Sequence, residues 1–337
     1  MSTLQNKLGI KYPIFQAPMA GGILSPAFVA QVCNFGLLGA VPSGYLSLSQ
    51  TSAFIEEVKK QTDLPFALNL FVDYEIYNSH IQIKKPDEII EIERIYDKES
   101  SYTFHLPSQP NIDTLIQLAI DCAVPVVSTT FGLLSPTHVE ALKSAGIKIM
   151  TTINCVYELS IALKTQQPDI LIYQNSQAGG HKGGSTSLPH STEEEIVEYM
   201  DKQRNVYYVL AGSIVNKIDV DLALSKGFDG VQIGTGFLAT QESSANNEYK
   251  RAIIKNTETA FTTSITGRPA RGLINHIACL SIQNNLGFPY MHYATANLRK
   301  LAKTSGELDF QSLWCGNGIS KIHNILTLND YMESLIL

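Results

Sequence analysis

The chain has 337 residues, a length that suits one barrel-sized domain with a small addition. Hydrophobic residues make up 44% and charged residues 17%, so a large core is possible and intrinsic disorder is disfavoured. The net charge of -6 and the absence of a Lys/Arg run argue against a nucleic-acid-binding surface.

The cysteines are scattered and include no C-x-x-C pair: Cys33, Cys122, Cys155, Cys279 and Cys315. This pattern predicts neither a zinc site nor a disulfide framework, and it is typical of a reducing compartment. The N-terminal segment is polar, and no apolar run reaches membrane-spanning length. We therefore expect a cytoplasmic protein with no metal and no membrane or nucleic-acid partner.

Short apolar runs rich in β-branched residues recur along the first two thirds of the chain. They are continuously apolar rather than alternating, which is typical of parallel strands buried on both faces. In chain order they occupy residues 13–18, 37–43, 65–72, 124–131, 147–153, 169–175, 207–212 and 230–237.

Helical patterns lie between these runs, at 25–36, 138–146, 156–165 and 220–227, and Gly36 is a plausible C-cap of the first. Repeated strand-helix units predict parallel strands joined by crossover helices. The number of units favours a (β/α)8 TIM barrel over an open sheet.

Two regions interrupt this pattern. Residues 74–112 are polar, charged and rich in Tyr, and contain no strand-like run, whereas residues 245–310 look helical. We expect both to pack over the barrel mouth as a smaller, mainly helical lid. The predicted domains are therefore a cofactor-binding barrel at 1–245 with a lid-like excursion at 74–112, a helical lid or substrate domain at 246–317, and one closing helix at 318–337.

The strongest local motif is a glycine-rich loop around one histidine. It runs QNSQAGGHKGG from Gln174, directly after the sixth predicted strand, with His181 between Gly179, Gly180 and a second glycine pair. Glycine lets the backbone approach a planar or anionic ligand closely. A histidine held there has an ordinary pKa near physiological pH, so His181 is the candidate catalytic residue.

Small residues also follow the seventh and eighth strands, at Gly212-Ser213 and at Gln232, Gly234 and Thr235. In TIM barrels these two loops are the usual phosphate-binding site. After the first strand, Ala17, Pro18 and Met19 lead into two glycines, and a backbone of this kind could hold the edge of a flavin; Met19 could equally fill a gap in the core.

Asn69 is polar inside the apolar third strand, so it needs either core partners or a cofactor. Several other signatures are missing: a Rossmann glycine motif after a first strand, a P-loop, an HExxH motif, a Ser-His-Asp pattern and a paired-carboxylate site. Their absence favours an enzyme whose difficult chemistry belongs to an organic cofactor.

Taken in order, QAPMAGG at 16–22, Asn69, QxxxAGGHxGG, LAGSI, QIGTGF and WCGNG at 314–318 resemble the bacterial nitronate monooxygenases, once called 2-nitropropane dioxygenases. RPARG at 268–272 and FPY at 288–290 resemble family segments too. The likeness covers nearly the whole chain. It implies an FMN-dependent TIM barrel that oxidises alkyl nitronates, such as propionate 3-nitronate, with O2 to a carbonyl compound and nitrite.

By the same resemblance, the FMN phosphate would lie on the Gly212 and Gly234–Thr235 loops, with Asn69, Gln174 and Gly179 at the ring and ribityl chain. His181 would orient the nitronate and balance its charge, and could take a proton from a neutral nitroalkane. The chain departs from the family pattern at Asn175, Gln177, Ser213 and Asn317, and at Met291-His292. A monomer or homodimer is expected.

Two other functions stay open on the sequence. One is an FMN- and NAD(P)H-dependent reductase resembling the enoyl-acyl-carrier-protein reductases, which share the barrel and the AGGH loop. The other is a flavin-binding or degenerate barrel with a sensing or interaction role and little turnover. Tyrosines at 74, 77, 290 and 293 could line the pocket, or could pack the lid onto the barrel.

Overall fold

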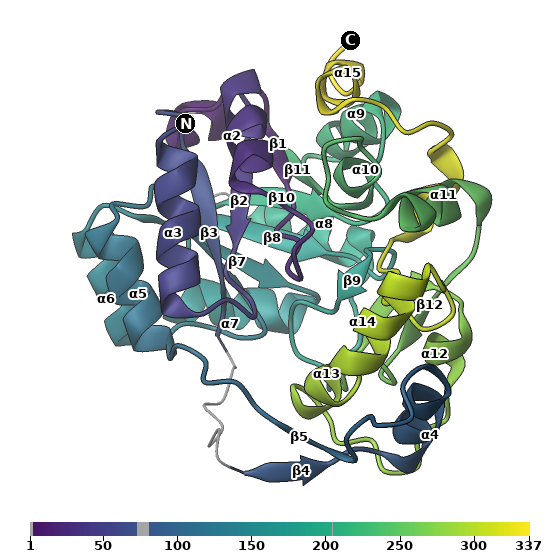
Figure 1. Ribbon diagram of the computed structural model, residues 1–337. Coiled ribbons are helices and arrows are strands. Elements are labelled where there is room, and N and C mark those ends of the chain that lie inside the picture. The colour runs from purple at the N-terminus through teal and green to yellow at the C-terminus, as the bar shows by residue number, and fades with distance from the viewer. Residues whose placement is uncertain (1–2, 73–80, 204) are drawn as a thin grey trace.

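The computed structural model describes residues 3–72, 81–203 and 205–337. At its centre lie eight parallel strands in the order β1-β11-β10-β8-β7-β6-β3-β2 (Figure 1). Their bounds are β1 Ile14–Gln16, β2 Gly39–Pro42, β3 Phe66–Phe71, β6 Val126–Thr130, β7 Lys148–Ile153, β8 Ile170–Gln174, β10 Tyr207–Ala211 and β11 Gly230–Ile233. Each lies within one of the predicted apolar runs, and the predicted TIM barrel is confirmed.

The two outermost strands of this order, β1 and β2, approach each other and nearly close the barrel. Phe15 and Leu38 form a parallel bridge, and Leu38 N donates to Ile14 O at 3.1 Å. The Gln16 side chain extends the contact, because its Oε1 accepts the Ala40 N–H at 3.0 Å. Since all strands run the same way, their carboxyl ends meet at one rim, where barrel enzymes carry their sites.

Alternate strand residues pack two hydrophobic layers. One face of the strands fills the barrel interior, which in an eight-stranded barrel is just wide enough for side chains. That inner cluster includes Phe15, Ala67, Val126, Met150 and Val209, together with Leu4 and Leu8 of the short helix α1 (Leu4–Leu8). The other face packs against the surrounding helices through residues such as Leu68, Val127, Ile149, Leu171 and Tyr208.

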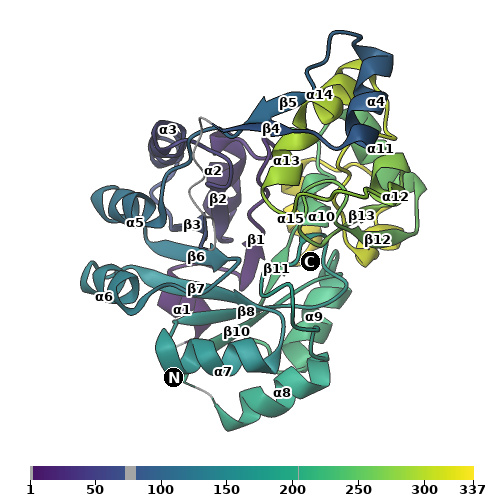
Figure 2. The same ribbon diagram turned by 90° about the horizontal axis from the view of Figure 1, so that it is seen from below.

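An arc of helices surrounds the strands (Figure 2). They are α2 Pro26–Phe35, α3 Leu48–Lys59, α5 Ile112–Asp121, α6 Pro136–Ser144, α7 Val156–Thr165, α8 Glu193–Lys202 and α9 Lys217–Ser225. The four helices predicted from periodicity are confirmed. In α2, Ser25 Oγ caps Phe28 N at 3.1 Å and Gly36 ends the helix with φ 102°, as its sequence pattern indicates.

The strand predicted over 230–237 is too long. β11 ends at Ile233, and residues Thr235–Leu238 form the short helix α10. Phe237 of that helix is fully buried and meets the Tyr331 ring edge-on at 5.2 Å. A continuous apolar run does not by itself distinguish a buried strand from a buried helical turn, which explains the error.

The expectation of a mainly helical region at 245–310 is only partly right. It contains α11 (Asn247–Lys255), α12 (His276–Cys279), α13 (Tyr290–Ala294) and α14 (Ala296–Ser305), but also strands β12 (Thr259–Thr262) and β13 (Ala270–Leu273). β13 lies between β12 and the two-residue strand β9 (Gly180–His181), with Arg271 opposite Gly180. Because that partner is remote in the chain, local periodicity could not predict the strand.

The excursion after β3 also contains strands where none was predicted. Within its described part, β4 (Gln82–Lys84) and β5 (Thr103–His105) pair antiparallel, and α4 (Asp87–Tyr96) connects them in the sequence. Both strands are three residues long and partly exposed, so they lack a recognisable apolar pattern. In both views α4 lies beside α14, far from the barrel helices that neighbour it in sequence (Figures 1 and 2).

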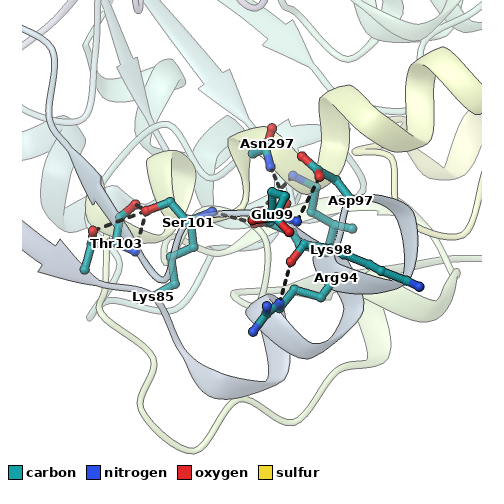
Figure 3. Close-up of polar contacts among 11 residues, drawn as sticks. Lys85, Arg94, Asp97, Lys98, Glu99, Ser101, Thr103 and Asn297 are labelled. Atoms are coloured by element: carbon teal, nitrogen blue, oxygen red, sulfur yellow. Dashed lines mark hydrogen bonds and ion pairs between the residues drawn. The ribbon is translucent and has the colours of Figure 1, made fainter.

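Buried polar contacts attach the excursion to α14. Glu93 is fully buried and pairs with Lys85, while its second carboxylate oxygen accepts Leu298 N at 3.0 Å. Figure 3 shows the neighbouring contacts, among them Asn297 Nδ2 donating to Ser100 Oγ at 3.2 Å. The two regions that were expected to form a lid therefore contact each other directly. Their movement as a lid, and the domain boundaries at 245 and 317, stay predictions.

The last segment is not one helix over 318–337, as expected. Residues Asn317–Lys321 form a 3-10 turn, η1, and only Leu328–Ser334 form a helix, α15. Thr327 starts α15, because its hydroxyl accepts Asp330 N at 3.1 Å. The part of the chain before that cap runs irregularly past the Ser213 loop, where Gly318 packs closely on Val215 and Ser213.

Candidate active site

A cavity of about 250 Å3 lies at the carboxyl rim of the barrel. It collects residues from the loops after nearly every strand and from the small β12-β13-β9 sheet. All the site residues predicted from the sequence line it: Ala17, Pro18, Met19, Asn69, Gln174, Gly179, Gly180, His181, Gly212, Ser213, Gln232, Gly234 and Thr235. The structure therefore brings all the predicted residues to one cavity, and their roles in catalysis and cofactor binding stay predictions.

The loop that carries His181 is held by three side chains through successive backbone N–H groups. The N–H of residue 183 donates to Gln174 Oε1 at 2.7 Å, that of 184 to Asn154 Oδ1, and that of 185 to Glu158 Oε1. Asn154 is itself fixed, because its Nδ2 donates to the Gln174 backbone oxygen at 2.7 Å. No residue of this brace except Gln174 was singled out from the sequence.

The carbonyl groups of the same loop are also occupied. Gln174 Nε2 donates to the oxygen of residue 181 at 3.0 Å, and Phe131 N donates to that of residue 183. Arg268 donates to the oxygens of residues 182 and 184 while its guanidinium stacks over the Phe131 ring at 4.0 Å. With nearly every backbone polar group bonded, the loop is preorganised and holds the histidine in one position.

One tautomer of His181 satisfies both contacts of Thr266. Its Nε2 lies 2.9 Å from Thr266 Oγ1, and the Thr266 hydroxyl can donate to Arg268 O at 3.2 Å. In that arrangement the Thr266 oxygen accepts from His181, and Nε2 carries the proton. Nδ1 is left as an unprotonated acceptor with no partner among the described residues.

The ring of His181 is neutral near pH 7. Burial lowers its pKa to about 3, and the positive charges of Arg268 and Arg299 act in the same direction. Phe131, Phe288 and Trp314 surround it, with ring centroids 5.7, 6.1 and 5.6 Å away. Burial therefore disfavours the charged form of the ring. The charge-balancing role that the family resemblance implied for His181 stays a prediction.

At the opposite side of the cavity, two loops present unused backbone donors. Within the described chain, the N–H groups of Gly212, Ser213, Gly234 and Thr235 donate to no other residue. Gly212 and Ser213 have φ values of 123° and 59°, which turns the backbone sharply after β10. Thr235 Oγ1 accepts Gly316 N at 3.0 Å, which leaves its own hydrogen available for donation. Such converging donors are typical of an anion site.

The side-chain amides of Asn69 and Gln174 already form most of their possible hydrogen bonds within the protein. Asn69 Nδ2 donates to Ser128 Oγ at 3.0 Å, and Asn69 Oδ1 accepts from Thr130 Oγ1 at 3.1 Å. Gln174 Oε1 accepts from both the 183 N–H and Asn154 Nδ2, at 2.7 and 3.0 Å. Gln174 keeps one amide N–H for a ligand, whereas Asn69 Nδ2 also lies 3.5 Å from a second acceptor, Ser128 O. Ser128 and Thr130 also line the cavity, and the sequence analysis did not identify them.

Two of the residues that depart from the family pattern, Asn175 and Asn317, form hydrogen bonds with neighbouring segments. Asn175 Oδ1 accepts Gln177 N at 3.0 Å, and its Nδ2 donates to Glu193 at 2.9 Å. Asn317 Oδ1 accepts from Arg271 Nη1 at 3.1 Å. These side chains therefore brace the loops around the cavity rather than point into it.

Of the four tyrosines named from the sequence, the two in the described part of the chain do not line the cavity. Tyr290 and Tyr293 are absent from its lining residues, and Tyr293 Oη instead accepts from Gln109 at 3.1 Å. Tyr74 and Tyr77 lie outside the described residues. The lining does include Tyr45, His292 and Arg299, of which only His292 had been noticed, as a departure from the family pattern.

Comparisons with known proteins point to the family that the sequence motifs resemble. A family model described as nitronate monooxygenase matches residues 1–337. A probable nitronate monooxygenase of Staphylococcus saprophyticus is 34% identical over 92% of this chain and 89% of its own length, and one of Bacillus subtilis is 31% identical over 99% and 98%.

Among solved structures, a nitroalkane oxidase from Streptomyces ansochromogenes superposes with a TM-score of 0.80 and 27% identity, over 99% of this chain and 96% of that one. FabK from Thermotoga maritima has a TM-score of 0.77 over 100% and 95%, but its 22% identity supports the fold alone.

The expectations about disulfides, metal sites and membrane spans can be compared with the residues that the structure describes. All five cysteines are unpaired, and no group of His, Cys, Asp or Glu there could hold a metal ion. No helix in those ranges is long and apolar enough to cross a membrane.

Proposed function

The chain belongs to the nitronate monooxygenase family of oxidoreductases, and on that premise we propose that it uses FMN to oxidise alkyl nitronates with O2 to a carbonyl compound and nitrite. One observation carries the proposal. A single cavity has free backbone donors for a phosphate on one side and a preorganised, neutral histidine among aromatic rings on the other.

The donor set of the cavity fits FMN. The N–H groups of Gly212, Ser213, Gly234 and Thr235 would hold the phosphate, because they have no other acceptor in the described chain. Gly180 has φ 73° and open space where a side chain would stand, so a flat ring can approach its backbone closely.

The remaining predicted contacts would hold the ring and the ribityl chain. Gln174 keeps one amide hydrogen, which suits a ring carrying several acceptors, and Asn69 would border the same ring. The Ala17–Met19 segment and Gln232 would border the ring from the β1 side, where Met19 also packs against two hydrophobic clusters. Gly179 cannot change, since a Cβ there would meet the backbone of Cys315 at 2.4 Å.

When bound, FMN supplies the redox chemistry: it accepts electrons from the nitronate and passes them to O2. The residues of the chain bind and orient. His181 Nδ1 presents a lone pair to the cavity lined by Trp314 and Phe131, whose rings exclude water from the reacting carbon.

The low pKa of His181 also bears on the form of the substrate. A ring whose pKa is about 3 is a weak base and cannot readily remove the carbon-bound proton of a neutral nitroalkane. The site therefore favours nitronates, which are already deprotonated, over nitroalkanes. We therefore propose orientation of the nitronate, rather than proton abstraction, as the main role of His181.

The test starts with the purified protein. The cofactor released by heat is identified by mass, and oxygen uptake and nitrite are then measured with propyl-1-nitronate and with NADH alone. We expect FMN, nitrite formation with the nitronate, and no flavin bleaching by NADH under anaerobic conditions. Bleaching by NADH without nitronate turnover would instead support the reductase alternative, and a tightly bound flavin inert to both would support the sensing alternative.

His181→Ala is the matched variant. It should retain FMN, because the phosphate donors lie on other loops, yet lose most of its kcat/KM for the nitronate. An unchanged kcat/KM in a variant with full FMN content would remove His181 from the reaction.

A further inference from the structure

Arg299 is a cation inside the cavity without a counter-ion. It extends from α14, where Nε donates to Thr295 Oγ1 at 3.2 Å and Nη2 donates to His292 O at 2.7 Å. Neither partner is charged, and Nη1 has no acceptor among the described residues. No Asp, Glu or Lys lines the cavity, so Arg299 is the permanent charge of the described cavity wall.

Tyr45 presents a second unused donor to the same space. Its Oη is buried and has no hydrogen-bond partner in the described chain. The ring is held firmly: it stacks on His292 at 3.8 Å with an interplanar angle of 2°, and meets Phe71 edge-on at 5.6 Å. Its backbone adopts φ 69°, a conformation that is uncommon outside glycine and that aims the side chain from the loop after β2.

The two groups contact the same residue, because the Tyr45 ring stacks on His292 and Arg299 Nη2 donates to the His292 backbone oxygen. Burial raises the pKa of the Tyr45 phenol, and the positive charge of Arg299 opposes that rise. A buried guanidinium without an acid and a buried hydroxyl without a partner are each costly to folding, and strained or unsatisfied groups gather at binding sites. The other charged or titratable groups around them, His181, His292, Tyr293 and Arg268, include no carboxylic acid.

We infer that Arg299 and Tyr45 form a subsite for a planar oxyanion, with a free guanidinium nitrogen for one oxygen and a phenol hydrogen for the other. The inference rests on the proposed function for the identity of the substrate, but not for the binding of an oxyanion. Two groups share the required shape and charge: the nitronate itself, or a carboxylate at the far end of a nitronate substrate.

The first test measures binding rather than turnover. Butanoate is titrated into the FMN-saturated protein by calorimetry, and butanamide, which lacks the charge, serves as the comparison ligand. We expect butanoate to bind and butanamide not to bind. Tyr45→Phe and Arg299→Met should each weaken butanoate binding at least roughly tenfold, while Arg251→Met, the same change at an exposed site on α11, leaves it unchanged.

Thermal stability distinguishes a binding role of Tyr45 from a structural one. Tyr45→Phe removes a hydroxyl that has no partner in the described chain, so its melting temperature should stay the same or rise. Weaker butanoate binding together with unchanged or higher stability supports the subsite. A lower melting temperature with unchanged binding overturns the role of Tyr45.

Turnover then identifies which oxyanion occupies the subsite. The values of kcat/KM for propyl-1-nitronate and propionate 3-nitronate are compared in the wild type and in both variants. An equal loss for the two substrates places the nitronate at Arg299, whereas a loss confined to propionate 3-nitronate places its carboxylate there.

The outcomes separate the two proposals. If the wild type binds butanoate but oxidises neither nitronate, the proposed function fails and the oxyanion subsite stands. If butanoate binds with equal affinity to the wild type, Tyr45→Phe and Arg299→Met, or does not bind at all, the subsite is refuted whatever the enzyme oxidises.

Discussion

Acidification should destabilise this protein through His181, by an amount that follows from its burial. The folded state lowers the His181 pKa from 6.5 to about 3, so the folded ring stays neutral where the unfolded ring binds a proton. The unfolded state therefore holds more protons below about pH 6.5, and the free energy of unfolding falls as the pH drops from there toward 3. At about pH 5 the loss is about 2 kcal/mol, set by protonation of the unfolded ring at its ordinary pKa.

Comparison with His181→Gln isolates this contribution. Glutamine can still donate to Thr266 but does not titrate, so it removes the pH dependence that belongs to His181. Urea unfolding of both proteins at about pH 7.5 and about pH 5 should show the wild type losing about 2 kcal/mol more than the variant. A stability difference that is constant over this range, within about 0.5 kcal/mol, would falsify the inference that the folded ring is neutral.

Three further changes test the loops and the excursion. Asn154→Ala leaves the buried Gly184 N–H without an acceptor and should lower the free energy of unfolding by about 1–3 kcal/mol in urea, with a drop in kcat as the histidine loop loosens. Gly212→Ala should weaken FMN binding at least roughly tenfold in a fluorescence titration, because φ is 123° and the new methyl would stand 1.9 Å from Asn175 Oδ1. Glu93→Gln removes the charge partner of a buried lysine and should destabilise the protein by about 3–5 kcal/mol, measured by thermal and urea unfolding.

The barrel could be predicted because its signals are local. Each strand is a short continuous apolar run, as in residues 66–71, and each crossover helix has its own period and caps, as Ser25 and Gly36 show for α2. The small β12-β13-β9 sheet could not be predicted in this way. Its strands are short, and β13 is completed by the two residues at 180–181, which lie some ninety positions earlier in the chain.

The cavity-lining residues were predictable for a related reason. In a parallel barrel all residues directly after a strand reach the same rim, so position in sequence alone brings the loops at 17–19, 179–181, 212–213 and 234–235 together. Position in the sequence does not predict which hydrogen bonds each side chain forms. Gln174 was expected to contact the cofactor, but its side-chain amide forms most of its hydrogen bonds with the His181 loop and with Asn154. No sequence pattern identified Asn154.

The distribution of charge in the cavity could not be predicted from the sequence. A histidine between glycines suggests a positive group near physiological pH, but the pKa depends on the aromatic rings that bury it, and these come from three distant segments. Arg299, in contrast, stands on a polar helix where arginine is usually a solvated residue. Its importance comes from the lack of any acid around it in the described cavity, a property of the assembled site that no single segment contains. The roles that we propose, with the positive charge on Arg299 and a neutral acceptor at His181, therefore depend on tertiary structure and differ from those that the motif alone suggests.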